Sequence, residues 1–208
     1  NYLSERKSVL YGDKLICISK RDSSLLKKIY GKEATHISGM ALRDKLPTDY
    51  RLSQNVTNKK FALFVGGAFY ANQKGIAWFV KHVVPKIDIK VYIIGKGFEE
   101  FKHSLELEGK VEVIGEVKNL SNWYFQAHFV IAPIFKGSGM KTKIAEAIMF
   151  GKKIIGTPEA FSGYEDVIDQ LGWICETPND FVKAVVQANN LIENSFDPSM
   201  RAIYEKKY

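Results

Sequence analysis

Short apolar runs alternate with longer segments of helical periodicity from about residue 61 onward. Runs of roughly 4 to 8 apolar residues are typical of strands buried on both faces, and their alternation with helices indicates a parallel sheet covered on both sides. We therefore predict an α/β fold with a doubly wound, parallel, six-stranded, Rossmann-like sheet of strand order 3-2-1-4-5-6 and right-handed crossovers. The predicted strands lie at about 61–66, 90–95, 110–114, 128–133, 152–156 and 172–175, and the predicted helices at about 73–86, 98–108, 119–126, 140–150, 160–170 and 179–194.

The first part of the chain shows a different pattern and is too short to bury a core of its own. The tail of one helix is followed by a predicted strand at 14–18 and by a second helix at about 22–30, which Ser19 or Asp22 caps and Gly31 ends. From residue 32 to residue 60 the chain is polar and irregular, which is typical of a linker. We place a domain boundary near residue 60. The predicted units are therefore 1–60 and 61–208.

A glycine-rich loop follows the fourth predicted strand. Gly137 and Gly139 lie where the strand gives way to a helix, so backbone N–H groups and the helix N-terminus point at one place, as in anion-binding sites. Lys141 and Lys143 fall in the predicted first helical turn, where a cation is unfavourable by roughly 0.3–1 kcal/mol unless an anion is bound nearby. A phosphate group would supply that anion. The alternative is a solvated helix face with one weak pair between Lys143 and Glu146.

A second glycine loop follows the first predicted strand. It contains Gly66 and Gly67, then Asn72 as the expected helix cap and Lys74 in the predicted first turn of the next helix. In a doubly wound sheet the first and fourth strands are neighbours where the strand order reverses, and ligands bind in the crevice beyond their carboxyl ends. Both glycine loops therefore open into one crevice. We predict a diphosphate-binding site at this point.

The charge of the chain narrows the class of partner. A net charge of +7 favours an anionic partner. No arginine occurs between residues 52 and 200, whereas base recognition in nucleic acids relies on the arginine guanidinium group, so we predict no nucleic-acid partner. A lysine-rich surface is compatible with peripheral contact with an anionic membrane, and equally with a charge that only maintains solubility.

The chain lacks sequence signals for membrane insertion, export and metal binding. No apolar run approaches the roughly 18 residues of a membrane span and no signal peptide opens the chain, so we expect a soluble protein that is cytoplasmic or membrane-peripheral. Cys17 and Cys175 each lie in an apolar run without the spacing of metal ligands, so we expect buried thiols and no metal site. Because the chain begins with Asn1 rather than Met, we expect it to be an excerpt of a longer protein.

Several motifs occur in an order found in one enzyme family. They are Phe64-Val65-Gly66-Gly67, Asn72-Gln73-Lys74-Gly75, Val91-Tyr92-Ile93-Ile94-Gly95, Gly115-Glu116-Val117, the stretch from Ala132-Pro133-Ile134 to Glu146-Ala147, the stretch from Gly151 to Pro158, and Ser162-Gly163-Tyr164-Glu165. Over about 61–175 the chain resembles the carboxy-terminal half of retaining GT-B glycosyltransferases of group 1. The resemblance implies binding of a nucleoside diphosphate sugar, UDP- or GDP-linked, without a separate cofactor or metal. It also implies that a missing amino-terminal domain, of which 1–60 is the remnant, binds the acceptor, so this fragment should transfer no sugar by itself. The pathway expected for such an enzyme is polysaccharide or glycolipid biosynthesis.

The resemblance also implies roles for particular residues. Gly67 and Lys74 would lie near the donor diphosphate, Val117 would border the base, and Glu146 would take the ribose hydroxyl groups. The loop 137–141 would give backbone amides to the diphosphate. The candidate donor-binding residues are Gly66, Gly67, Val117, Gly137, Ser138, Gly139, Met140, Lys141 and Glu146, and the candidate catalytic residues, for charge stabilisation, are Lys74, Lys141 and Lys143.

The sequence departs from the family pattern at two positions. Ser138 stands where the family has a second glutamate, which contacts the donor sugar, and Ala68 stands where it has an arginine. Lysines and backbone amides would still stabilise the negative charge that develops on a departing diphosphate. Two alternatives follow. The missing acid favours a catalytically silent GT-B subunit that binds a nucleotide or a partner enzyme, and the shared architecture is also that of a GT-B sugar-nucleotide epimerase.

Overall fold

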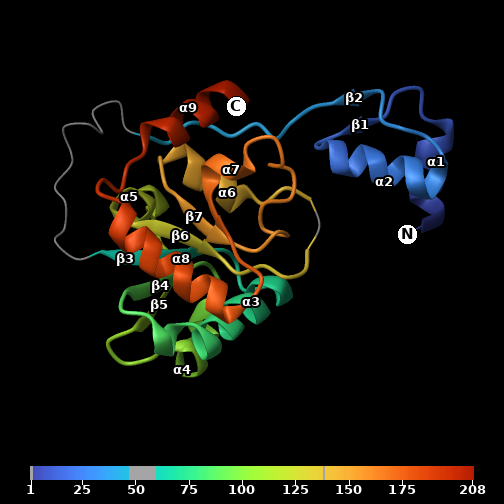
Figure 1. Ribbon diagram of the computed structural model, residues 1–208. Coiled ribbons are helices and arrows are strands. Elements are labelled where there is room, and N and C mark those ends of the chain that lie inside the picture. Colours follow the sequence, from blue (N-terminus) through green and yellow to red (C-terminus); the bar gives the residue numbers. More distant parts are fainter. Residues whose placement is uncertain (1, 47–59, 138) are drawn as a thin grey trace.

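A sheet of six parallel strands forms the centre of the computed structural model, which describes residues 2–46, 60–137 and 139–208 (Figure 1). The strand order is β5-β4-β3-β6-β7-β8. The predicted order 3-2-1-4-5-6 and the doubly wound α/β fold are therefore confirmed. The strands are β3 (Phe61–Val65), β4 (Lys90–Ile94), β5 (Val111–Gly115), β6 (Phe129–Ala132), β7 (Ile154–Gly156) and β8 (Gly172–Ile174).

Helices follow the strands along the chain and lie on both sides of the sheet (Figure 1). They are α3 (Tyr70–His82), α4 (Lys102–Leu105), α5 (Leu120–Gln126), α6 (Thr142–Met149), α7 (Ile168–Leu171), α8 (Pro178–Leu191) and α9 (Pro198–Lys207), with short 3-10 helices at η1 (Val84–Lys86) and η2 (Phe98–Phe101).

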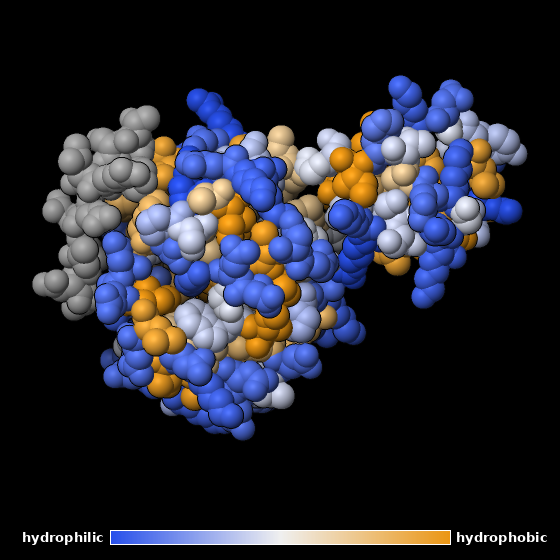
Figure 2. Space-filling view, turned by 45° about the horizontal axis from the view of Figure 1, so that its top comes forward, coloured by the Kyte–Doolittle hydropathy of each residue, from blue (hydrophilic) through white to orange (hydrophobic). Residues whose placement is uncertain are grey.

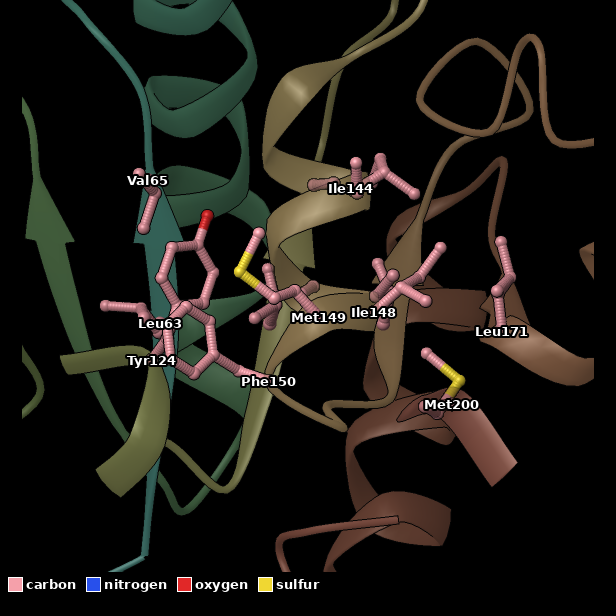
Figure 3. Packing of buried hydrophobic residues seen from close by; sticks show 14 of the residues in the cluster. Leu63, Val65, Tyr124, Ile144, Ile148, Met149, Phe150, Leu171 and Met200 are labelled. Atoms are coloured by element: carbon pink, nitrogen blue, oxygen red, sulfur yellow. The ribbon is translucent and has the colours of Figure 1, made fainter. Parts of the chain in front are cut away.

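Each face of the sheet packs against a hydrophobic core of its own, because successive residues of a strand point to opposite faces. In β3, Leu63 belongs to the cluster formed with α5, α6 and α9, whereas Phe64 belongs to the cluster formed with α3 and α8. Figure 3 shows the first cluster, in which Tyr124 of α5 lies beside Phe150 with their rings stacked at 5.3 Å. Burial on both faces explains why β3 is apolar at every position.

Two helices differ from the prediction. The predicted helix at 160–170 is wrong, because most of this stretch forms turns and only α7 is helical. Gly163 has a φ of 90°, which a helix does not accommodate. The sequence analysis also missed α9, although Asp197 caps it and Pro198 occupies its first turn, which are both helix-start signals.

Residues 2–37 form a smaller lobe apart from the sheet (Figure 1), whereas Met40, Leu42 and Leu46 pack against the main core. In it, Ser19 caps the predicted helix by accepting from the Asp22 amide, and Gly31 ends it with a φ of 75°, which confirms both boundary signals. The strand predicted at 14–18 is confirmed as β1, whereas its parallel partner β2 was not predicted, and the two strands leave apolar side chains at the surface (Figure 2). Cys175 is buried as expected, whereas Cys17 is only half-buried. The elements of this lobe are α1 (Tyr2–Tyr11), β1 (Ile16–Cys17), α2 (Lys20–Tyr30) and β2 (His36–Ile37).

Gly75 lets α3 approach the segment that follows β6. A Cβ atom at this position would lie 1.8 Å from the carbonyl oxygen of Pro133, which is backbone and has little room to move. We expect Gly75→Ala to lower the free energy of unfolding by about 2 kcal/mol, because overpacking against backbone outweighs the gain of about 1 kcal/mol in helix propensity. Denaturant titration would measure this loss. Gly39→Ala is the matched control, since no atom lies within 4 Å of its Cβ, and equal stability of the Gly75 variant and the wild type would contradict the prediction.

Candidate functional site

A cleft of about 480 Å³ opens where the strand order reverses. β3 and β6 are hydrogen-bonded neighbours, so the loops after them line the same cleft, as the sequence predicted. The volume falls within the range of small-molecule sites, roughly 300–1,000 Å³. The end of β3, the loop after it and α3 contribute Val65, Gly66, Gly67, Phe69, Ala71 and Asn72, and the second loop and α6 contribute Ile134, Lys136, Gly137, Met140, Lys141, Thr142, Lys143 and Glu146.

Asn72 and Lys143 form a buried pair at this cleft. Lys143 Nζ donates to Asn72 Oδ1 at 2.8 Å, and the two residues are 9% and 2% exposed. Asn72 does not cap α3 as predicted, because the helix already begins at Tyr70 and its N-cap is Phe69. The solvated-face alternative is also wrong for Lys143. A Cβ on Gly66 would lie 2.7 Å from Lys143 Nζ, so glycine is needed where the strand meets this pair.

Burial lowers the pKa of Lys143 to about 7, and the positive charge of Lys141 contributes in the same direction. The carboxylate of Glu146 opposes this shift. The amine and the ammonium forms of Lys143 therefore coexist near neutral pH. An anion in the cleft would favour the ammonium form.

The carboxylate of Glu146 is oriented by two neighbours. Its Oε2 accepts from the Tyr124 hydroxyl at 3.1 Å, and its Oε1 accepts from Lys45 Nζ at 3.3 Å. The side chain is 13% exposed, so it is held against the core rather than projecting into solvent from a polar helix face. Burial, with the nearby Glu146 charge, raises the pKa of Tyr124 well above its usual value, so the hydroxyl stays protonated and donates.

Lys141 has an anionic partner within the chain. It is the N-cap residue of α6 rather than a first-turn residue, which corrects its predicted position. Its Nζ donates to Glu159 Oε1 at 3.0 Å and to the Gly139 carbonyl at 2.7 Å. Glu159 also accepts from Arg21 of α2 at 3.3 Å, and Arg21 bonds to Ser162 as well. A bound phosphate is therefore not required to offset the charge of Lys141.

We expect the Lys141–Glu159 pair to stabilise the ligand-free protein by about 1 kcal/mol, since both side chains are largely buried, at 10% and 20% exposure. Lys141→Gln and Glu159→Gln should each lower the unfolding free energy, and the double variant should lose less than the sum. A double-mutant cycle from denaturant titrations measures this coupling and removes the separate contribution of Arg21. Coupling near zero would contradict the assigned pair.

Three predicted residues, Lys74, Val117 and Gly139, do not line the cleft, and one cannot be placed. Lys74 is the fifth residue of α3, not a first-turn residue, and its Nζ lies 4.5 Å from the centre of the Tyr70 ring, in a separate cavity of about 240 Å³. Val117 is half-buried against the core and does not line the cleft. Ser138 lies outside the described residues. The cleft brings together Gly66, Gly67, Gly137, Met140, Lys141, Lys143 and Glu146, and the carbonyl of Gly139 bonds to Lys141.

The sequence analysis missed three side chains that hold the site residues. Tyr124 and Lys45 orient Glu146, and Glu159 holds Lys141. Glu159 could have been found, because the predicted strand order places the loop after β7 next to the loop after β6. Nothing local marks Lys45 or Tyr124, since both reach Glu146 only through tertiary packing.

The described part of the chain contains no helix with the length and apolarity of a membrane span. Within that same part, no three histidine, cysteine or carboxylate side chains are grouped in a way that would hold a metal ion.

Comparisons with known proteins give one family and one fold. The family model described as glycosyl transferases group 1 matches residues 59–190. A mutant of S. aureus TarM, in complex with fondaparinux, alpha-GlcNAc-glycerol and UDP, superposes with a TM-score of 0.79 at 15% identity, covering 100% of this chain and 43% of that one. WaaG, a glycosyltransferase involved in lipopolysaccharide biosynthesis, superposes with a TM-score of 0.70 at 15% identity, covering 99% of this chain and 60% of that one. Anabaena HepE in complex with UDP-glucose superposes with a TM-score of 0.74 at 14% identity, covering 100% of this chain and 63% of that one.

At these identities the likeness to solved structures shows a shared fold. The chain spans less than two thirds of each of these three structures, from 43% of TarM to 63% of HepE. No curated protein sequence matches the chain.

Proposed function

The chain belongs to the glycosyl transferases group 1 family, and on this basis we propose that it is the donor-binding part of a retaining glycosyltransferase. The observation that carries the proposal is the convergence of Lys143, Lys141 and Glu146 on one cleft at the point where the strand order reverses. Two cations and one oriented carboxylate suit a ligand that carries both a diphosphate and vicinal hydroxyl groups. A nucleoside diphosphate sugar has this chemistry.

In the proposed complex, Lys143, Lys141 and the N-terminus of α6 bind the diphosphate. Negative charge grows on the diphosphate as the bond to the sugar breaks, so cations and amides fixed in position stabilise the transition state more than the ground state. Glu146 accepts hydrogen bonds from the ribose hydroxyl groups, and Tyr124 and Lys45 hold its carboxylate in position for this role.

We propose that 1–60 is the remnant of an acceptor-binding domain and that 61–208 is the donor-binding domain. The chain's coverage of less than two thirds of the similar structures supports a missing part. This fragment should then bind donor without transferring sugar, which incubation with UDP-sugars and product chromatography would test. Transfer by the purified 208-residue chain would overturn the division of roles.

The proposed pathway is polysaccharide or glycolipid biosynthesis, in line with the description of WaaG as an enzyme involved in lipopolysaccharide biosynthesis. The proposed location is the cytoplasm, where the lysine-rich surface of the protein would suit the anionic face of a membrane.

Calorimetric titration with UDP, GDP and ADP tests the proposed function and identifies the base. UDP is the first probe because TarM and HepE were crystallised with UDP or UDP-glucose. Saturable binding of at least one nucleotide is expected, and absence of binding to all three would overturn the proposal. A catalytically silent subunit is the second candidate, favoured by Ser138 and Ala68 at positions where the family has charged residues. It predicts nucleotide binding without donor turnover even when the acceptor-binding domain is supplied.

A further inference from the structure

A single buried amide joins the two loops of the cleft. Asn72 Oδ1 accepts from Lys143 Nζ at 2.8 Å, which ties α3 to α6, and Asn72 Nδ2 donates to the Gly67 carbonyl at 2.7 Å, which fixes the loop after β3. Both polar atoms of the amide are engaged, and the side chain is almost fully buried. Its orientation is therefore determined by hydrogen bonding, with no room for a flipped amide.

The Lys143 ammonium group has little freedom and no ionic partner among residues 2–46, 60–137 and 139–208. Its Nζ lies 4.5 Å from the centre of the Phe64 ring and close to the backbone of Gly66. Lys143 nevertheless lines the cleft, so an anion bound there would be its ionic partner. A charge held in this way needs a fixed neutral acceptor in the ligand-free protein, and Asn72 supplies it.

We propose that Asn72 is a positioning residue that holds the Lys143 ammonium group at the floor of the cleft, where a diphosphate binds. The inference rests on the proposed function and extends it to a residue that acts only through Lys143. It also couples ligand binding to a proton, which passes from solvent to the Lys143 amine when the diphosphate enters.

The charges around Lys143 determine the direction of this coupling. Its pKa of about 7 reflects burial first, then the charge of Lys141, with Glu146 opposing both. Lys136 also lines the cleft, Lys141 is paired with Glu159, and Glu146 is bonded to Lys45 and Tyr124. Near pH 8 most of the ligand-free protein therefore carries the neutral amine. Binding of UDP at pH 8 should take up nearly one proton per site.

The affinity of the wild type for UDP should consequently fall about tenfold between pH 6 and pH 8, when it is divided by the affinity of Lys143→Met at the same pH. This ratio cancels the titration of the UDP phosphate itself, because that titration affects both proteins equally and the variant has no lysine at position 143. Calorimetry in buffers of different ionisation enthalpy gives both the affinity and the number of protons taken up. If Asn72 had a purely structural role, its replacement would lower the affinity for UDP by the same factor at every pH.

Two variants of Asn72 should move this pH profile in opposite directions. Asn72→Asp places a carboxylate beside the Lys143 amine and raises its pKa, so affinity should change less than threefold between pH 6 and pH 8 and proton uptake at pH 8 should largely disappear. Asn72→Ala removes the acceptor and lowers the pKa of Lys143, so the loss of affinity should be several times larger than in the wild type.

The possible outcomes distinguish a failure of the role proposed for Asn72 and Lys143 from a failure of the proposed function. UDP binding without proton uptake in the wild type at pH 8 overturns the role of the pair while leaving the proposed function standing. Identical pH profiles for the wild type and either Asn72 variant that folds overturn the positioning role. Opposite displacement of the two profiles supports it. Absence of UDP binding at every pH overturns the proposed function itself.

Discussion

Lys152→Met is expected to raise the free energy of unfolding at pH 7 by about 2 kcal/mol. Lys152 is fully buried, and burial lowers its pKa to about 7. Relative to an unfolded lysine of pKa about 10.4, this shift costs about 4 kcal/mol at pH 7, at roughly 1.4 kcal/mol per pKa unit. Lys152→Met removes this cost, but it also loses the 2.8 Å hydrogen bond from Nζ to the Phe125 carbonyl at the end of α5. The lost bond lowers the stability by about 2 kcal/mol, so about half of the relief remains.

The same residue should make the wild-type protein more stable as the pH rises above 7. A lysine whose folded pKa is lowered binds more protons in the unfolded state between pH 7 and pH 10.4, so stability increases with pH across this window. The contribution of Lys152 amounts to about 2 kcal/mol between pH 7 and pH 9. Lys143, whose pKa is also about 7, contributes with the same sign, so Lys152→Met should reduce the pH dependence without abolishing it.

Denaturant titrations at pH 7, 8 and 9 would measure both effects. The matched control is Lys153→Met, because Lys153 is the next residue but is paired with Asp197 at 2.9 Å and remains partly exposed. This control should keep the wild-type pH dependence. Parallel pH profiles for Lys152→Met and the wild type would show that Lys152 is charged in the folded protein at pH 7, and the prediction would be wrong.

The fold could be predicted because its signals are local and repeated. Each buried strand is an apolar run, as in the five buried residues of β3, and each run ends at a glycine or polar loop. The stretch 160–170 failed because its apolar residues suit a helix while Gly163 adopts a left-handed conformation. Gly163 is also packed closely against Met140, whose side chain would lie 2.4 Å from a Cβ at Gly163.

The site could be predicted only in outline. Glycine and lysine near two strand ends located the cleft, because strand order alone brings the two loops together. A helical wheel of α6 could not reveal that Lys143 is buried, since Asn72 on α3 and Phe64 on β3 cover it. Lys74 was misplaced because α3 begins at Tyr70 without a polar cap residue, which moves this lysine into the second turn.

The second large effect expected concerns the two halves of the ligand, which different residues should contact. Lys143→Met should weaken binding of both UDP and inorganic pyrophosphate by at least tenfold, because a charge-assisted bond to phosphate contributes roughly 1.5–3 kcal/mol. Glu146→Gln should weaken UDP about tenfold, since a neutral acceptor replaces a charged one at the ribose, while Tyr124 keeps an oxygen to donate to. Pyrophosphate has no ribose, so at pH 6, where Lys143 is mostly protonated, its affinity should change less than twofold in Glu146→Gln.

Lys74→Met separates the family resemblance from the observed geometry. The resemblance implies that Lys74 lies near the diphosphate, whereas the structure places its Nζ over the Tyr70 ring, in a cavity next to the cleft. If the observed geometry holds in the complex, Lys74→Met should bind UDP and pyrophosphate as the wild type does, within a factor of two. Calorimetry of the three variants with the two ligands measures all six affinities. Equal losses of affinity for UDP and pyrophosphate in Glu146→Gln would show that Glu146 does not contact the ribose. A tenfold loss of affinity in Lys74→Met would mean that α3 rearranges to bring this lysine into the cleft.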